Sequence, residues 1–156
     1  MGIKVLVFKL DMKINEKLLK EKSSIKLYLS GNYTYTDKNP KKLTLIQETS
    51  KGSNLSLSNG GVKIGKGITH VLVTGQVYFF TGANHNDGKC CHIYKNSTKV
   101  SGTHNRTNLN YIHINASTII PVTEGDIIYL YAQNDTTNQT VIAGGDGNTY
   151  LNVIEL

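Results

Sequence analysis

Residues 68–80, ITHVLVTGQVYFF, form the longest apolar segment of the chain, and their pattern indicates the fold class. Successive side chains of an extended strand point to opposite sides, so this segment has two distinct faces. One face carries Val71, Val73, Gly75, Val77 and Phe79. The other face mixes apolar and polar side chains, including Leu72, Gln76 and Tyr78. This pattern predicts a strand of a β-sandwich, with one face in the core and the other available to a partner.

The segments on either side of this strand repeat the same alternation and are separated by turn residues. Further strands are predicted at residues 25–29, 33–35, 43–46, 55–57, 62–64, 91–94, 99–101, 111–114, 119–122, 127–131, 141–143 and 149–156. Polar loops are predicted at residues 83–88, 102–110 and 133–138. Strands and turns at such short, regular spacing indicate an all-β jelly-roll β-sandwich.

The N-terminal residues have a different pattern. Residues 3–10 predict a strand, and residues 12–22 predict the one short helix of the chain, with Glu16 and Lys20 as an i,i+4 pair. We therefore divide the chain into an attachment or docking segment, residues 1–24, and a jelly-roll domain, residues 25–156. A free tail is the alternative for the first segment. The apolar run at residues 5–10 is short and is interrupted by Lys9, so no signal peptide is predicted.

Composition narrows the classes of partner. The 156 residues suit one domain, and no apolar run approaches the roughly 18 residues that predict a transmembrane helix. The formal net charge is +6, but Arg106 is the only arginine. Nucleic-acid readers rely on arginine for bidentate contacts, so the lysines are interpreted as a solvated surface. Neither nucleic-acid binding nor membrane insertion is predicted.

Four segments in the second half of the chain occur in a recognisable order. They are Gly75-Gln-Val-Tyr-Phe79, the turn Lys95-Asn96 with Ser97 in the usual glycine place, Ile119 to Leu130 with its Gly125-Asp126 turn, and the closing strand Thr149 to Ile154. In this order and spacing the chain resembles the TNF-like jelly roll of the tumour necrosis factors and the globular heads of the first complement component. Asn152 stands where the closing motif of that family has glycine.

The tract from Ile93 to Asn134 is similar to the C-terminal domains of tail-fibre, baseplate or head-fibre proteins of phages and prophages of low-GC Gram-positive bacteria. The resemblance implies a compact homotrimer at a virion or extracellular surface, fixed to a larger particle through its N-terminus, with receptor recognition as its role. Two alternatives remain: a bacterial surface or spore-coat adhesion head of the same fold, and a carbohydrate-binding accessory module of an enzyme.

Polar loops on a rigid scaffold are the candidate ligand-binding surface, because Asn, Arg and His hydrogen-bond sugar hydroxyls and phosphate. The candidate residues are Asn84, His85, Asn86, Asp87, His104, Asn105, Arg106, Asn134 and Asp135. Merely solvated turns are the alternative for each loop. A host-surface glycan is the expected ligand.

Catalytic chemistry is not predicted. The five histidines lack a metal-ligand spacing, no serine nucleophile elbow occurs, and the carboxylates are scattered in turn contexts. Asp146 alone supplies too few carboxylates for a calcium loop. We therefore expect no enzyme activity, no cofactor and no metal.

The outer sheet face leads to two further expectations. A partly apolar outer face must be covered, and the residues expected near a threefold axis are Tyr129, Tyr131, Tyr150 and Ile154. The adjacent Cys90 and Cys91 point to opposite faces of a strand, which predicts one buried thiol and one partly exposed thiol. A disulfide within the pair or to another chain is the alternative.

Overall fold

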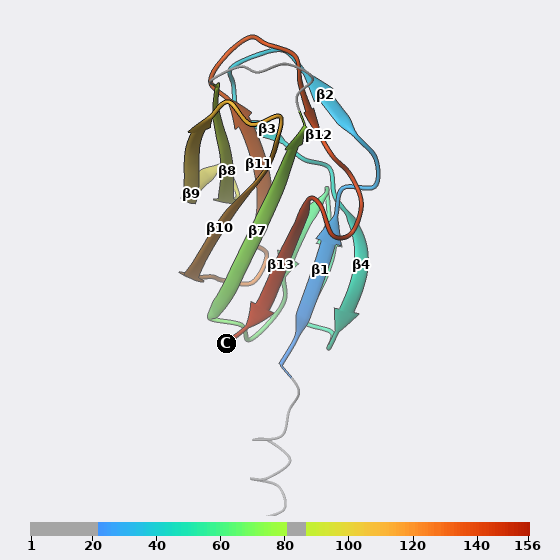
Figure 1. The fold of residues 1–156 in the computed structure, drawn as a ribbon. Coiled ribbons are helices and arrows are strands. Elements are labelled where there is room, and N and C mark those ends of the chain that lie inside the picture. Colours follow the sequence, from blue (N-terminus) through green and yellow to red (C-terminus); the bar gives the residue numbers. More distant parts are fainter. Residues whose placement is uncertain (1–21, 81–86) are drawn as a thin grey trace, which may run out of the picture.

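The computed structural model describes residues 22–80 and 87–156, which form a sandwich of two antiparallel sheets (Figure 1). The first sheet contains β1 (Ser24–Tyr28), β2 (Tyr33–Tyr35), β4 (Ile46–Lys51), β7 (His70–Phe80), β10 (Tyr111–Pro121), β12 (Thr140–Ile142) and β13 (Tyr150–Glu155). The second sheet contains β3 (Lys41–Lys42), β5 (Leu55–Ser58), β6 (Gly61–Ile64), β8 (Asp87–Lys95), β9 (Thr98–Thr107) and β11 (Ile127–Asn134). The all-β jelly-roll prediction is confirmed. The strand predicted at residues 3–10 and all but the last residue of the helix predicted at 12–22 lie outside the described residues.

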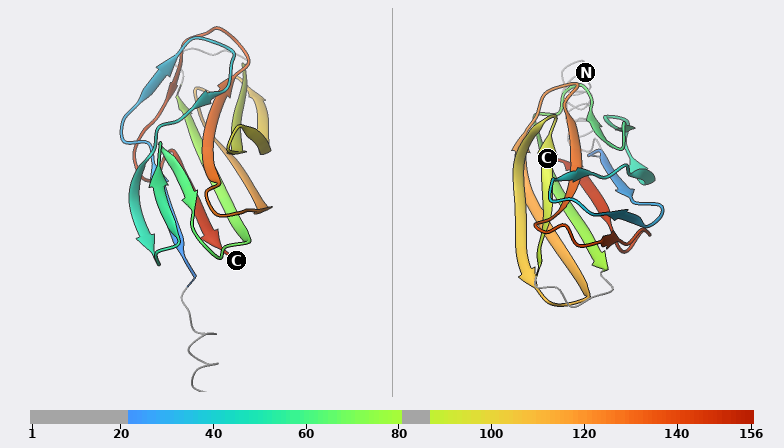
Figure 2. Two further views of the ribbon diagram at one scale, coloured as in Figure 1. Left: turned by 180° about the vertical axis from the view of Figure 1, so that it is seen from behind. Right: turned by 90° about the horizontal axis from the view of Figure 1, so that it is seen from above.

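In each layer one strand pairs with three others: β7 with β10, β12 and β13, and β11 with β3, β6 and β8. The first sheet runs β2-β12-β7-β13-β1-β4, with β10 on the other side of β7. The second runs β5-β6-β11-β8-β9, with β3 also paired to β11. Figure 2 shows the two layers from behind and from above. The described residues contain no helix, and hence none long and apolar enough to cross a membrane.

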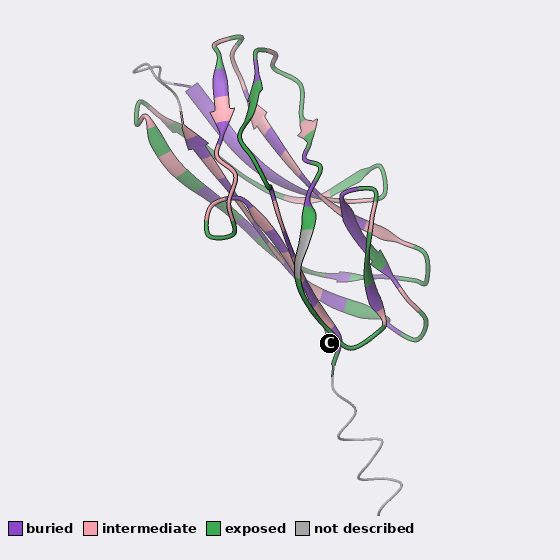
Figure 3. Cartoon of the chain, turned by 90° about the vertical axis from the view of Figure 1, so that its right-hand side faces the viewer, coloured by how far each residue is buried: buried purple, intermediate pink, exposed green. Residues whose placement is uncertain are grey.

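The core lies between the inner faces of the sheets, and burial alternates along the long strands (Figure 3). On β7, Val71, Val73, Val77 and Phe79 are fully buried, as the sequence predicts. Gly75 belongs to the same face, where an added Cβ would lie 2.6 Å from Cδ1 of the fully buried Leu130. The two sheets therefore approach too closely at this point for a side chain.

Several predicted boundaries are wrong. The expected loop at residues 102–110 is strand up to Thr107, because β9 continues as an exposed edge strand whose polar side chains show no alternation. The two strands expected at 111–114 and 119–122 are one strand, β10, paired with β7 along its whole length. Most of the strand expected at 43–46 is the connection between β3 and β4, although Leu43 and Leu45 are buried there; only Ile46 is strand, as the first residue of β4.

The cysteine prediction is half right. Cys91 faces the core, where burial raises the pKa of its thiol to about 12. Cys90 faces the other side of β8, but it is buried too, which corrects the expected exposure. The structure contains no disulfide at either cysteine.

Both ends of the described chain lie at one end of the sandwich, here called the proximal end (Figure 1). The Ser23 amide donates to Glu155 Oε2 (2.9 Å), the Glu155 amide donates to Ser23 O (2.8 Å), and the Leu156 amide donates to His70 O (3.1 Å). At the opposite, distal end, β7 and β11 finish while β8 and β10 begin. The distal end is therefore the part of the domain furthest from its chain ends.

Candidate functional site

The carboxylate of Asp135 organises an exposed cluster at the distal end. Its Oδ1 accepts a hydrogen bond from the Gly88 amide (2.7 Å), and its Oδ2 accepts one from Nη2 of Arg106. The ring nitrogen Nε2 of His104 lies 4.0 Å from the same Oδ2. The side chains of His104 and Arg106 are each about half exposed. The result is a held carboxylate with two donor groups that also face solvent.

Strand pairing explains how these residues meet. Arg106 on β9 is the register partner of Gly88 on β8, and His104 is the partner of Cys90. Because alternate residues share a face, Arg106 and His104 both lie on the outer side of the second sheet. A Cβ on Gly88 would lie 2.2 Å from His104 Nε2 and 2.4 Å from Asp135 Oδ2. Glycine at this position therefore leaves the space in which the cluster forms.

The inner side of the same strand ends is polar as well. Asp87 and Asn134 are buried, at 3% and 0% exposure, on the faces of β8 and β11 that continue the core. Asn134 Nδ2 donates to Asp87 Oδ2 (3.4 Å) and to Thr140 Oγ1 (2.5 Å). Asn138 Nδ2 also donates to Asp87. The side chains of Asp87 and Asn134 therefore face the interior and are not accessible to a macromolecular ligand.

The structure thus brings together residues from three segments that the sequence treats as separate loops. Asp87, His104, Arg106, Asn134 and Asp135 all lie at the distal end. Asn105 lies there too, exposed, on the side of β9 opposite to His104 and Arg106. Asn84, His85 and Asn86 lie outside the described residues. The predicted loop at 83–88 is corrected at its end, because Asp87 already belongs to β8.

Two buried residues beside the cluster are not among the predicted site residues. Lys89 is fully buried in β8, and His92 is 4% exposed on the outer face. His92 Nε2 lies 2.9 Å from Oε1 of Gln133, so the neutral ring donates from Nε2. Burial lowers the pKa of His92 below its ordinary value. The sequence pattern could have indicated that Lys89 is buried, because alternate residues of a strand share a face and Lys89 is two residues before Cys91 and four before Ile93.

The four residues expected at a threefold axis lie on opposite outer faces. Tyr129 and Tyr131 are on the outer face of the second sheet, where Tyr131 stacks on Tyr94 at 4.1 Å and Lys42 Nζ lies 4.8 Å from the Tyr129 ring. Tyr150 and Ile154 are on β13, on the outer face of the first sheet. A contact that uses only one face includes only one of these pairs.

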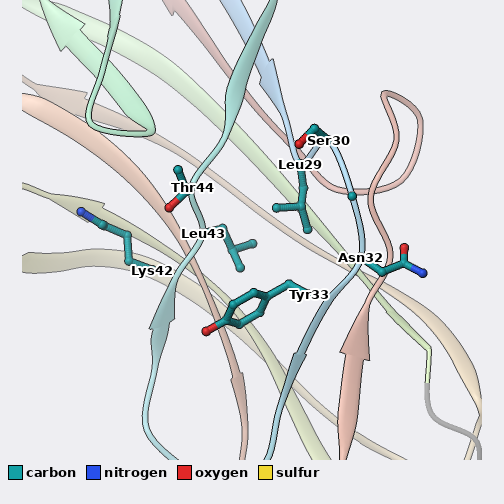
Figure 4. A pocket seen from close by; sticks show the side chains of 8 residues that line it. Leu29, Ser30, Asn32, Tyr33, Lys42, Leu43 and Thr44 are labelled. Carbon is teal, nitrogen blue, oxygen red and sulfur yellow. The ribbon is translucent and has the colours of Figure 1, made fainter.

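A pocket of about 250 Å³ opens at the side of the sandwich, between the β1–β2 connection and the segment after β3 (Figure 4). Its lining residues are Leu29, Ser30, Gly31, Asn32, Tyr33, Lys42, Leu43 and Thr44. These residues include no carboxylate, histidine or cysteine. Within residues 22–80 and 87–156, no three His, Cys, Asp or Glu side chains are grouped as ligands for a metal ion.

No protein-family model and no curated protein matches the chain. Solved structures do match. Murine APRIL at pH 5.0 aligns with a TM-score of 0.65 at 13% identity, over 87% of this chain and 100% of that one. The Eiger TNF from S. frugiperda aligns with a TM-score of 0.63 at 11% identity, over 88% and 94% of the two chains. The PRD1 vertex protein P5 aligns with a TM-score of 0.61 at 12% identity, over 86% and 96%.

These alignments cover nearly the whole of each matched chain. The matched structures are TNF proteins as well as a vertex protein. The fold of this chain is therefore the TNF-like jelly roll.

Proposed function

We propose that this chain is a non-enzymatic virion module that assembles as a homotrimer, is attached through its N-terminal segment, and presents its distal end to a host-surface glycan. The observation that carries this proposal is the separation of the two ends. The described chain starts and finishes at the proximal end, whereas the exposed cluster around Asp135 lies at the distal end. The likeness to the PRD1 vertex protein P5 supports the virion setting.

The outer face of the first sheet supports the trimer. Tyr111 and Ile119 on β10 are 59% and 61% exposed. Next to them Phe80 stacks on Tyr111 at 5.0 Å, and Tyr78 stacks on His113 at 4.2 Å. Exposed aromatic and aliphatic side chains of this size on one sheet face are typical of an interface. A heterologous contact around a threefold axis covers such a face on every protomer.

Light scattering on a size-exclusion column tests the assembly. The expected molar mass is about three times the 17.2 kDa of one chain. The Ile119→Glu variant places a charge in the proposed contact and is expected to elute as a monomer. Leu57→Glu is the matched control, because Leu57 is also exposed (40%) but lies on β5, at the edge of the other sheet. A monodisperse monomer for the unmodified chain overturns the trimer.

The distal cluster has the chemistry for glycan recognition. Asp135 holds the guanidinium of Arg106, which fixes the direction of this half-exposed cation. Beside it, the half-exposed ring of His104 offers a further hydrogen-bonding edge. Sugar hydroxyls and the phosphates of teichoic acid both suit such donors.

Binding of the full chain to a glycan array and to purified Gram-positive cell walls tests this assignment. Arg106→Ala is expected to reduce binding at least tenfold. Lys66→Ala is the control, because it removes an exposed cation from the connection between β6 and β7, which lies at the proximal end. Equal binding by the two variants, or no binding by the unmodified chain, overturns the assignment.

A further inference from the structure

The core of the sandwich becomes polar at its distal end, at one pair of neighbouring strands. On β8 the inward series Ile93, Cys91 continues with Lys89 and Asp87. On β11 the inward series ends with Asn134. Lys89 and Asn134 are both 0% exposed. An amine and a carboxamide therefore lie inside the protein, at the polar end of its core.

Lys89 and Asn134 are direct cross-strand partners. They occupy the last paired position of the β8–β11 ladder, opposite one another and on the same, inner face. The Cβ atoms of such partners are about 4.5–5.5 Å apart. The flexible lysine side chain is longer than this separation. It is therefore long enough for its amine to reach the side-chain carbonyl carbon of the asparagine.

The polar atoms of this pair are not satisfied within the described part of the chain. Lys89 Nζ and Asn134 Oδ1 are buried there without a hydrogen-bond partner. An unpaired ammonium inside a protein is costly, which favours the neutral amine. Burial lowers the pKa of Lys89, although the charges of Asp87 and Asp135 oppose the shift. The neutral amine is also the nucleophilic form.

The asparagine is held by the nitrogen of its carboxamide. Asn134 Nδ2 donates to Thr140 Oγ1 (2.5 Å), to Thr136 Oγ1 (3.3 Å) and to Asp87 Oδ2 (3.4 Å). Asp87 is buried and lies two residues before Lys89 on the same face. A carboxyl group therefore touches the nitrogen that would leave, and its side chain is on the same face of β8 as the amine that would attack.

We propose that Lys89 and Asn134 react with each other to form an intramolecular isopeptide bond. Nζ of Lys89 attacks Cγ of Asn134, the new Nζ–Cγ bond forms, and the Cγ–Nδ2 bond breaks. One proton passes from Nζ to the departing Nδ2, with the Asp87 carboxyl group as the relay, and ammonia leaves. A neutral amine and a carboxamide thus become a secondary amide and ammonia, and no oxidant, reductant or other reactant is needed.

The product replaces the unsatisfied amine of Lys89, while Asn134 Oδ1 becomes the carbonyl oxygen of the new amide. The buried amine becomes an amide nitrogen with no charge to desolvate, and the strands β8 and β11 become covalently joined at the distal end. An arginine at position 89 would bury a group that stays charged and is not nucleophilic. Lysine, in contrast, can be neutral when buried and is then nucleophilic, as the reaction requires.

The mass of the intact, purified full chain tests the proposal. The expected mass is lower than the sequence mass by one ammonia, and a digest is expected to contain a branched peptide joining Lys89 to Asn134. Lys89→Met and Asp87→Ala are expected to keep their full sequence masses. Asn134→Asp is expected to lose water instead of ammonia and to reach the same final mass as the unmodified protein. Lys99→Met, which removes an exposed lysine on β9, is the control that still loses ammonia.

The branched peptide separates this reaction from succinimide formation, which also releases ammonia from asparagine. Asn59, which has a positive φ of 50°, is followed directly by Gly60, and this Asn–Gly pair is the competing source of released ammonia. Loss of ammonia at Asn59 gives no branched peptide and persists in Lys89→Met. A folded, unmodified chain with its full sequence mass, or a mass loss that Lys89→Met retains, overturns the proposal. The branched peptide remains decisive if a variant fails to fold.

Discussion

At the scale of single residues, Asp135 has more partners than its partly exposed position would suggest. It accepts from the Gly88 amide and from Arg106, and its own amide donates to Gly88 O (2.8 Å). Asp135→Ala leaves the buried Gly88 amide without its acceptor. We expect the free energy of unfolding to fall by about 1–3 kcal/mol, measured by urea denaturation. Asp146→Ala, in an exposed turn, should change it by about 0.5 kcal/mol or less. Equal effects of the two substitutions would contradict the role of Asp135.

His92 predicts a pH dependence of stability. Burial lowers its pKa, with Lys99 and His104 adding to the effect and the hydrogen bond with Gln133 opposing it. As the pH falls through about 6.5, the unfolded chain binds a proton at this ring that the folded chain does not yet bind. The free energy of unfolding should therefore decrease as the pH is lowered from about 7.5 to about 5.5.

The comparison that isolates this contribution is urea denaturation of the unmodified chain and His92→Gln across the same pH range. The stability difference between the two should shift in favour of the variant as the pH falls, because glutamine does not titrate. A difference that stays constant with pH would show that His92 has the same pKa in both states.

At the scale of elements, β7 depends on glycine at one position. An added Cβ on Gly75 would lie 2.6 Å from Cδ1 of Leu130, whose side chain is fully buried. We expect Gly75→Ala to lower the free energy of unfolding by about 1–3 kcal/mol through overpacking. Gly147→Ala is the matched control, since an added Cβ there meets no atom within 4 Å. A neutral Gly75→Ala would mean that the sheets can separate without cost at this point.

The same elements show which parts of the fold the sequence predicts. The strand β7 is predicted because its inward positions are apolar and its length exceeds that of a turn. The end of β9 is missed because the residues Gly102 to Thr107 are polar on both faces, as an exposed edge strand allows. The middle of β10 is missed because its polar stretch resembles a turn, although Ala116 is buried there. Local pattern identifies a strand only where one face is apolar.

At the scale of the whole molecule, the candidate site depends on topology. Residues near 87, 104 and 134 are distant in sequence and meet because β8 pairs with both β9 and β11. The sequence supplies the polar residue types, but the spatial grouping requires the strand order. The burial of Lys89 is missed for a related reason. A lysine can be predicted to be buried only when the bounds of its strand, and the face of the strand on which it lies, are known.

The proposed trimer has a consequence for the stability of the whole molecule. If the first sheet's outer face is covered only in the assembly, association stabilises the folded chain by mass action. The Tm of the unmodified protein should then rise with protein concentration. Ile119→Glu should show a lower Tm that does not change with concentration, because the variant does not associate. Ile119 is exposed in the single chain, so the substitution does not disturb the core. Leu57→Glu should retain the dependence of Tm on concentration.

Differential scanning calorimetry over a hundredfold range of protein concentration measures these Tm values. A constant Tm for the unmodified chain would mean that the outer face of the first sheet contributes nothing to stability through association.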